Sequence, residues 1–355
     1  MEIKRIIKKI NNKLTTVRRS GESLEEYLNA VLEDYKIDVS SISKETFIKH
    51  GLDRDSIVDN IQNSNKTIND ALIQYSTAHI VDCITTISDY INNNEKMLIL
   101  RVNKDSQEDK KWYRMRNQEK YKRLFPANEM FHIPFQLRGK VNTQRYSLPG
   151  YPCLYISRSI WATWEEMHEP QLSQFCVSLL EPQMSFSVLD LRLRNPETIQ
   201  DSEMEKVLCT LPLVISCSIK VLNPDDNFKP EYIIPQMVML SLVDNQNIIG
   251  CTYTSTQRND FFDWKDITKL DNIALPVKDT TKSNGLCQKL CSIFKVSDST
   301  NYDYEMLKQP FETTFFTEIE EGTVEIDTAK YYENSIFGQL ESRLDGKLLI
   351  NLNSN

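Results

Sequence analysis

Residues 112–167 contain the side chains of this chain whose types and spacing could do chemistry. The candidates are six of the basic residues and four of the tyrosines in this segment, although the net charge of the whole chain is −8. They are Arg114, Arg116, Arg138, Lys140, Arg145 and Arg158, with Tyr113, Tyr146, Tyr151 and Tyr155 among them. An arginine fork binds phosphate oxygens bidentately, and an aromatic face stacks on a planar ring. The set therefore suits a nucleotide such as a dinucleotide, unless the arginines only cover an aromatic core.

A turn, a strand and a helix are predicted to position these groups. Leu-Pro-Gly at 148–150 imposes a tight turn directly before the apolar run 153–157. Arg145 and Tyr155 are thereby held at opposite ends of one rigid unit. Eleven residues beyond Tyr155 comes Glu166, on a following helix, from which a carboxylate could point back at whatever the arginines hold.

Composition excludes several other kinds of site. With 9 Gly in 355 residues, the chain contains neither GxGxxG nor a P-loop motif, so any phosphate must be held by side chains. The net charge of −8 argues against a dedicated nucleic-acid binder. The closest cysteines, Cys287 and Cys291, have no second Cys or His pair nearby, so we expect no metal site.

The same sequence indicates a compartment. The first residues lack the apolar core and cleavage site of a signal peptide, and no apolar run approaches the ~18 residues of a membrane span. The eight cysteines are scattered, mostly inside apolar runs. We therefore expect reduced, buried thiols and a cytoplasmic protein.

The N-terminal third has the apolar periodicity of helices. A basic amphipathic stretch over 3–17 predicts either a helix on an anionic membrane surface or a helix docked on a core. Ser23 and Glu26 form a capping-box signature before a second helix over 24–35, and a third helical pattern runs over 67–91. Three consecutive asparagines at 92–94 end this pattern, so we predict a helical domain over 1–95 and a second domain over 96–355.

The second domain is predicted to be mixed. Short runs rich in β-branched and aromatic residues predict strands, and helical patterns lie between some of them, so the fold class is α+β. Helices are expected over 158–168 and 235–242, and near the C-terminus a helical stretch precedes a short strand or helical turn. The expected strands are 97–102, 153–157, 175–180, 186–193, 213–219 and 248–254.

In order and spacing, the motifs of 112–167 resemble those of the RES-domain family, which is named for its Arg, Glu and Ser and comprises toxins that degrade NAD. The family's pattern begins with a Tyr-Arg pair, which is matched here by Tyr113-Arg114. An arginine-aromatic turn and strand come next, matched by Arg145-Tyr146 through Gly150, Pro152 and Leu154-Tyr155. The pattern ends with a glutamate before an apolar residue, matched by Glu166-Met167. Tyr253-Thr254-Ser255 stands in the place of the family's Tyr-x-Ser, whereas Gln144 replaces its more usual glycine.

The resemblance implies an ADP-ribosyltransferase-like fold and cleavage of the bond between nicotinamide and ribose in NAD, which is the substrate, with no metal. Glu166 would contact the ribose and stabilise the positive charge of an oxocarbenium-like transition state. Arg114 and Arg145 would hold the diphosphate, and Ser255 would supply a polar contact. Tyr155 and Tyr113 would stack on the nicotinamide, with Tyr146 beside them in the nucleotide-binding set.

Several alternatives stay open at this point. The acceptor is water, inorganic phosphate or a protein side chain, the last making the protein an ADP-ribosyltransferase. Glu165 competes with Glu166 for the catalytic role. Residues 1–95 would inhibit the enzyme, mediate homo-oligomers or recognise a trigger, and an antitoxin or regulatory partner is expected for a NAD-consuming toxin or anti-phage effector. A degenerate binding or regulatory module without turnover is the alternative from another class.

Overall fold

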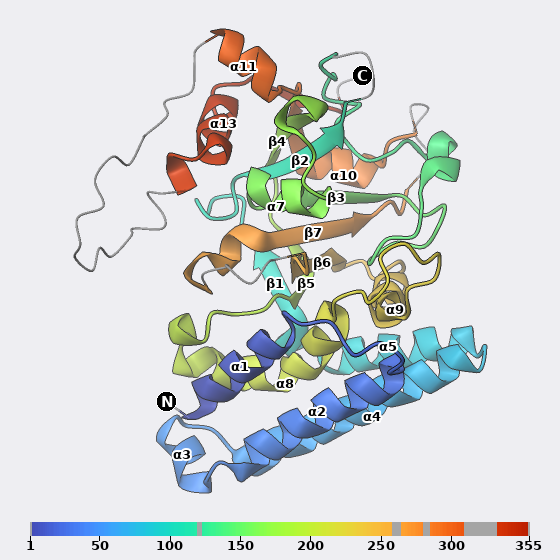
Figure 1. Ribbon diagram of the computed structural model, residues 1–355, viewed down its shortest axis with the longest axis vertical. Helices are drawn as coiled ribbons and strands as arrows, with labels where there is room; N and C mark the ends of the chain where they lie inside the picture. The colour runs from blue at the N-terminus through green and yellow to red at the C-terminus, as the bar shows by residue number, and fades with distance from the viewer. Residues whose placement is uncertain (1, 119–122, 258–263, 280–284, 309–331, 354–355) are drawn as a thin grey trace.

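The computed structural model describes residues 2–118, 123–257, 264–279, 285–308 and 332–353 (Figure 1). Its centre is a sheet whose strands, among these residues, follow the order β1-β5-β6-β7-β3-β2-β4-β8-β9. The predicted α+β class is confirmed. The strands are β1 (Ile99–Val102), β2 (Trp112–Asn117), β3 (Cys153–Ser157), β4 (Phe175–Pro182), β5 (Phe186–Leu191), β6 (Ile248–Thr254), β7 (Asp271–Pro276), β8 (Phe294–Ser297) and β9 (Leu349–Asn351).

Neighbouring strands pair antiparallel except β5 and β6, which are parallel. A parallel pair needs a long crossover connection. Here the crossover contains α8 (Asp201–Ser218) and α9 (Ile233–Ser241), preceded by the 3-10 turns Pro196–Thr198 and Pro230–Tyr232 respectively. The remaining described helices after β1 are α7 (Ile160–Glu166), α10 (Gln288–Ile293), α11 (Tyr302–Lys308) and α13 (Ile336–Leu344). Further 3-10 turns lie at Phe135–Lys140, Leu172–Gln174 and Trp264–Leu270.

Side chains alternate between the two faces of the sheet. On one face, Leu154, Ile156 and Ile273 belong to a core that also contains residues of α10. The opposite face carries two separate cores. Helices α8 and α9 cover the β5–β6 part of this face, and α7 and α13 cover the β2–β4 part. The candidate site lies on this second face.

The N-terminal helices lie at the lower end of the molecule in Figure 1 and pack against α8 and α9. Their apolar side chains belong to the same core as those of α8. The predicted capping box of Ser23 and Glu26 is confirmed. The helices are α1 (Glu2–Lys13), α2 (Leu24–Ser41), α3 (Lys44–Lys49), α4 (Arg54–Ser76), α5 (Ile80–Asn93) and α6 (Glu95–Leu98).

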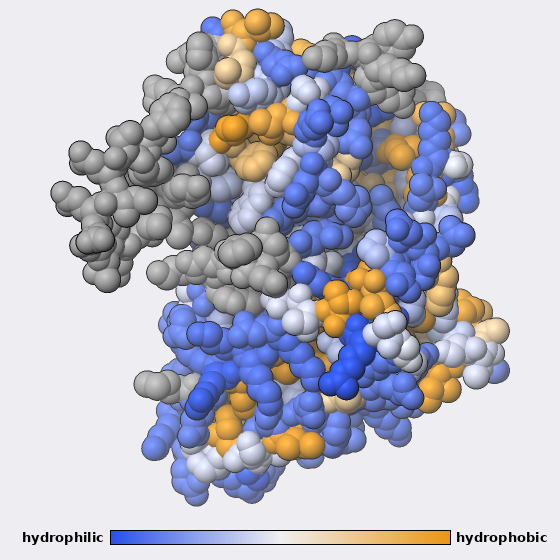
Figure 2. Space-filling model, viewed as in Figure 1, coloured by the Kyte–Doolittle hydropathy of each residue, from blue (hydrophilic) through white to orange (hydrophobic). Residues whose placement is uncertain are grey.

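The basic helix α1 is docked on the core. Its stripe of Ile3, Ile6, Ile7 and Ile10 is buried, while the surface around it is mostly hydrophilic (Figure 2). Lys9 pairs with Asp38 at 2.6 Å and thereby ties α1 to α2. Of the two interpretations of the amphipathic stretch, the docked helix is the one that the structure shows.

The single helix predicted over 67–91 is wrong, because two helices, α4 and α5, occupy this stretch. Between them Ala78 adopts a φ of 63°, and the Thr77 hydroxyl donates to the carbonyl of Ile73. Hydroxyl side chains compete in this way for backbone groups and favour helix ends. Since the apolar stripe continues on both sides of the break, periodicity alone does not reveal it.

The strand predicted over 213–219 is also wrong, because these residues form the end of α8 and its cap. Residues 207–218 are buried without interruption, since the helix is enclosed by the sheet, α4 and α9. A helix that is apolar on all sides has the same pattern as a buried strand. The predicted strand 97–102 also begins two residues too early, because Met97 and Leu98 belong to α6. Strands β2, β7 and β8 are absent from the predicted set.

Candidate functional site

Helix α7 carries Glu166 as its last residue. Ser159 caps the other end, since its Oγ accepts from the amide of Ala162 at 3.0 Å. Glu341 of α13 accepts from the amide of Ile160 at 2.7 Å and fixes the same end to α13. Just beyond Glu166, His168 and Glu169 have φ of 59° and 54°. Two consecutive non-glycine residues in the left-handed region represent backbone strain, which is common next to functional groups.

The carboxylate of Glu166 meets groups from three other segments. Asn272 of β7 donates from Nδ2 to Glu166 Oε1 at 2.9 Å, and the hydroxyl of Ser255 also hydrogen-bonds this carboxylate. Burial raises the pKa of Glu166, and this rise is opposed by Ser255, by the positive charges of Arg145 and His168, and by Asn272. The structure therefore brings three residues predicted from the sequence, Glu166, Ser255 and Arg145, into one cluster.

Arg145 is buried and closes the C-terminal end of α8. It donates from Nη1 to the carbonyl of Cys217 at 3.1 Å and from Nη2 to that of Ile219 at 3.0 Å. Nη2 also donates to Thr256 Oγ1 at 3.1 Å, and the guanidinium carbon lies 5.1 Å from the centre of the Tyr232 ring. These contacts use three of the five N–H donors of a guanidinium, so capacity for an anion is left.

The turn that presents Arg145 is held by α9. Gln236 donates from Nε2 to Thr143 Oγ1 at 3.0 Å and to the carbonyl of Gln144 at 2.9 Å. The amide of Gly150 bonds the carbonyl of Val141 at 3.0 Å, and Gly150 has a φ of 80°, a conformation that favours glycine. The one glycine of the predicted turn is thus used for its backbone conformation.

Tyr146, Tyr155 and Tyr253 lie close to one another, and Tyr253 also interacts with the charge of Glu166. The Tyr155 hydroxyl forms a hydrogen bond of 2.8 Å with Ser147 Oγ. The rings of Tyr146 and Tyr253 lie 4.5 Å apart, and burial raises the pKa of both hydroxyls. Tyr146 is buried, whereas Tyr155 is half-buried. Of these two members of the predicted nucleotide-binding set, Tyr155 is therefore the more accessible.

Arg114 and Tyr113 make their contacts elsewhere. Arg114 donates to the carbonyl of Tyr155 at 2.8 Å, and burial lowers the pKa of its guanidinium to about 10. Tyr113 is buried in the core that contains Ile160 and Leu340. Arg114 therefore supports the β3 backbone, and Tyr113 packs under α7.

Glu165 is buried beside Glu166. Burial raises the pKa of Glu165 to about 7, with the neighbouring charge of Glu166 as the next cause. Its Oε2 atom has no hydrogen-bond partner among the residues that the structure describes. Since Asn272 and Ser255 both bond Glu166, that carboxylate is the one connected to the rest of the cluster.

Sequence reasoning missed several supporting residues. Asn272 and Ser157 lie on paired strands, and Tyr232 and Thr256 contact Arg145. The signal for Ser157 was its place at the end of a recognised strand. No sequence signal marked Asn272, because β7 itself was not recognised.

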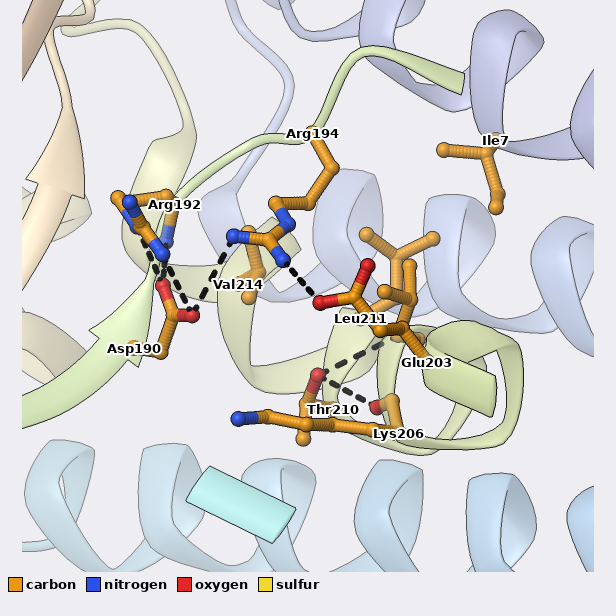
Figure 3. Close-up of a pocket in the computed structure, with 10 residues that line it drawn as sticks. Ile7, Asp190, Arg192, Arg194, Glu203, Lys206, Thr210, Leu211 and Val214 are labelled. Carbon is orange, nitrogen blue, oxygen red and sulfur yellow. Dashed lines mark hydrogen bonds and ion pairs between the residues drawn. The ribbon is translucent and has the colours of Figure 1, made fainter. Parts of the chain in front are cut away.

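A second polar cluster lies at the end of β5, next to α8 (Figure 3). Arg192 donates from Nε to Asp190 at 2.7 Å and lies 3.3 Å from Asp271, and Arg194 bonds Glu203 at 3.0 Å. Asp190, Arg192, Arg194 and Glu203 border a cavity of about 20 Å³, room for about one water molecule. The cluster is therefore a paired ionic network rather than a ligand pocket.

The described part of the chain contains neither a metal-ligand cluster nor a membrane-spanning helix. No group of three His, Cys, Asp or Glu side chains there could hold a metal ion. No described helix has the length and apolarity needed to cross a bilayer. None of the eight cysteines forms a disulfide, and all are buried, as the scattered positions predicted.

The fold and the site together define an α+β protein with a half-buried carboxylate, an arginine and a serine converging on one face of the sheet. No family model matches the chain, and no solved structure matches it. Among curated proteins, it is similar to the "Putative toxin YopC" of Bacillus subtilis strain 168, with 27% identity over 309 residues, which cover 81% of this chain and 67% of that protein. This similarity supports a toxin-like role.

Proposed function

We propose that this protein is a NAD-consuming toxin that cleaves the bond between nicotinamide and ribose. The observation that carries the proposal is the convergence of Glu166, Ser255 and Arg145, which come from three separate segments. Their order in the chain also matches the RES pattern, and the chain is similar to a protein named as a toxin.

The arrangement suits this chemistry. As the bond between C1′ and nitrogen breaks, its electron pair moves to the ring nitrogen, and nicotinamide leaves as a neutral molecule without an acid. Positive charge then develops on the ribose, and a carboxylate held beside it stabilises that charge. Glu166 is the candidate for this role, because Ser255 and Asn272 hold its oxygens in place.

Arg145 and Tyr155 are the candidates for binding the rest of the dinucleotide. The two N–H donors of Arg145 that the described contacts leave could bind the diphosphate, while Tyr155 offers a half-buried ring for the nicotinamide. Arg114 would then act on the site through the β3 backbone that carries Tyr155.

The degenerate-module alternative also has an observation in its favour. Arg145 already bonds two carbonyls at the end of α8, as a structural arginine would. Binding of NAD without release of nicotinamide would favour this alternative over the enzyme.

The test incubates purified protein with NAD, with and without inorganic phosphate, and follows nicotinamide by chromatography. ADP-ribose, its phosphate ester and a modified protein distinguish water, phosphate and a protein side chain as acceptor. We expect Glu166→Gln to lower the rate by about 10²-fold or more. Glu169→Gln, three residues further along and exposed, is the matched control. Intact NAD after long incubation with wild-type protein in both buffers would refute the proposal.

A further inference from the structure

One row of paired residues crosses the sheet below α7. Tyr113, Ser157, Asn272 and Tyr253 stand side by side on β2, β3, β7 and β6. Directly paired residues point to the same face of a sheet. The row thus has a tyrosine at each end and a polar pair in the middle, and both polar residues are buried, with 4% of Ser157 and 2% of Asn272 exposed.

The polar pair is linked to Glu166 by hydrogen bonds that run in one direction. Ser157 Oγ donates to Asn272 Oδ1, and Asn272 Nδ2 donates to Glu166 Oε1 at 2.9 Å. A carboxylate only accepts, so the amide must turn its nitrogen toward Glu166 and its oxygen toward Ser157. Thr252 of β6 holds the β7 backbone at this position, since its hydroxyl donates to the backbone carbonyl of Asn272 at 2.9 Å.

We propose that Ser157 and Asn272 are positioning residues that form a relay to Glu166, orienting its carboxylate over the sheet and keeping it ionised. The relay extends beyond the Arg, Glu and Ser of the family pattern. As a statement about catalysis, it rests on the proposed function. As a statement about the ionisation of Glu166, it can be measured without turnover.

The charges around Glu166 show what the relay contributes. Burial disfavours ionisation of Glu166, and its charge interacts with the neighbouring carboxyl of Glu165 and with the hydroxyls of Tyr232 and Tyr253. Arg145, His168 and the hydroxyl of Ser255 favour the ionised form. Arg145 also donates hydrogen bonds to the carbonyls of Cys217 and Ile219 at the end of α8. The bond from Asn272 is therefore a direct contribution to keeping the carboxylate charged.

Three variants test the relay. Asn272→Ala removes the donor to Glu166, Asn272→Asp keeps the shape but faces Glu166 with a second carboxyl, and Ser157→Ala frees the amide to rotate. The matched control is Ser178→Ala, because Ser178 is buried on β4 of the same sheet and its hydroxyl has no partner among the described residues.

The first readout is the pH dependence of NAD cleavage. Loss of a hydrogen bond to a charged group lowers kcat by about 10- to 100-fold, and we expect this for Asn272→Ala with little change in KM. The acidic limb of the kcat profile should move to higher pH in all three variants, with the smallest shift in Ser157→Ala, a larger one in Asn272→Ala and the largest in Asn272→Asp. Ser178→Ala should match wild type. A merely structural role would lower the amount of folded enzyme without moving the limb.

The second readout does not need activity. In protein labelled with ¹³C-glutamate, the carboxyl signal of Glu166 is assigned by its loss in Glu166→Gln, and its titration midpoint is compared among the variants. We expect a midpoint higher by about one unit in Asn272→Ala. Unchanged midpoints in Asn272→Ala and Asn272→Asp overturn the relay even if NAD is cleaved. Shifted midpoints in a protein that leaves NAD intact refute the proposed function and keep the relay. If Asn272→Ala does not fold, the titration midpoints of Glu166 in Asn272→Asp and Ser157→Ala test the relay in its place.

Discussion

The contact between Tyr35 and α8 gives a prediction about how the N-terminal helices support the site. Pro212 lies inside α8 and has no N–H, so it cannot bond the carbonyl of Leu208 one turn earlier. Tyr35 of α2 supplies the missing donor, since its hydroxyl lies 2.8 Å from that carbonyl oxygen. Both Tyr35 and Leu208 are fully buried, so water cannot replace this bond.

Tyr35→Phe should therefore destabilise the fold by about 2 kcal/mol, because an unsatisfied buried carbonyl costs about 1–3 kcal/mol. In a Pro212→Ala background the backbone regains an N–H that can bond the carbonyl of Leu208, and the same change should cost less by about 1 kcal/mol or more. Tyr27→Phe, on the same helix and at a hydroxyl for which no hydrogen bond is described, is the control and should change stability by about 0.5 kcal/mol or less.

The assay is urea unfolding of the single and double variants, with free energies taken from midpoints at constant m-value. Equal costs of Tyr35→Phe in the two backgrounds would refute the reasoning, because the hydroxyl would then not be compensating for the proline. A cost of Tyr27→Phe as large as that of Tyr35→Phe would also refute it, since burial rather than the hydrogen bond would explain both.

Two further predictions concern buried charges. Arg18 and Glu231 form a buried ion pair, and Glu231 also accepts from the amide of Leu222 at 3.0 Å. Arg18→Ala leaves that carboxylate without its charged partner and should lower the free energy of unfolding, measured in urea, by about 3–5 kcal/mol. Adding Glu231→Gln should recover part of this loss. Burial raises the pKa of Glu165 to about 7, so the folded state holds a proton that the unfolded chain has released, and the stability due to this carboxyl is lost as pH rises between about 4.5 and 7. Glu165→Gln should match wild type at pH 4.5 and exceed it at pH 8 by up to about 3 kcal/mol in thermal or urea unfolding, and equal differences at both pH values would contradict the assignment.

The parts of the site that could be predicted are those fixed by local sequence. The Leu-Pro-Gly turn, the strand 153–157 and the helix that follows are short-range features, and they place Arg145, Tyr155 and Glu166 much as the spacing implied. Ser255 follows the recognised strand 248–254 directly. Local rules suffice for such residues because turn geometry and strand alternation need no knowledge of the remaining chain.

The supporting residues could not be predicted, because they depend on pairing between distant segments. Asn272 meets Glu166 only because β7 pairs between β3 and β6, and the register of that pairing is not written in the local pattern of either strand. The carbonyls of Cys217 and Ile219 meet Arg145 only because their segment ends a helix rather than continuing as a strand. That choice depends on the burial of α8 on all sides.

Helix α8 connects the two halves that the sequence separates at residue 95. The carbonyl of Leu208 in the middle of this helix accepts a hydrogen bond from Tyr35 of α2. The carbonyl of Cys217 near its end accepts one from Arg145, a candidate ligand of the diphosphate. Buried polar groups must keep their partners, so a shift of α8 relative to the N-terminal helices would break one bond or the other. The packing of the N-terminal helices against α8 therefore helps to fix where that helix ends, and Arg145 bonds the carbonyls at that end.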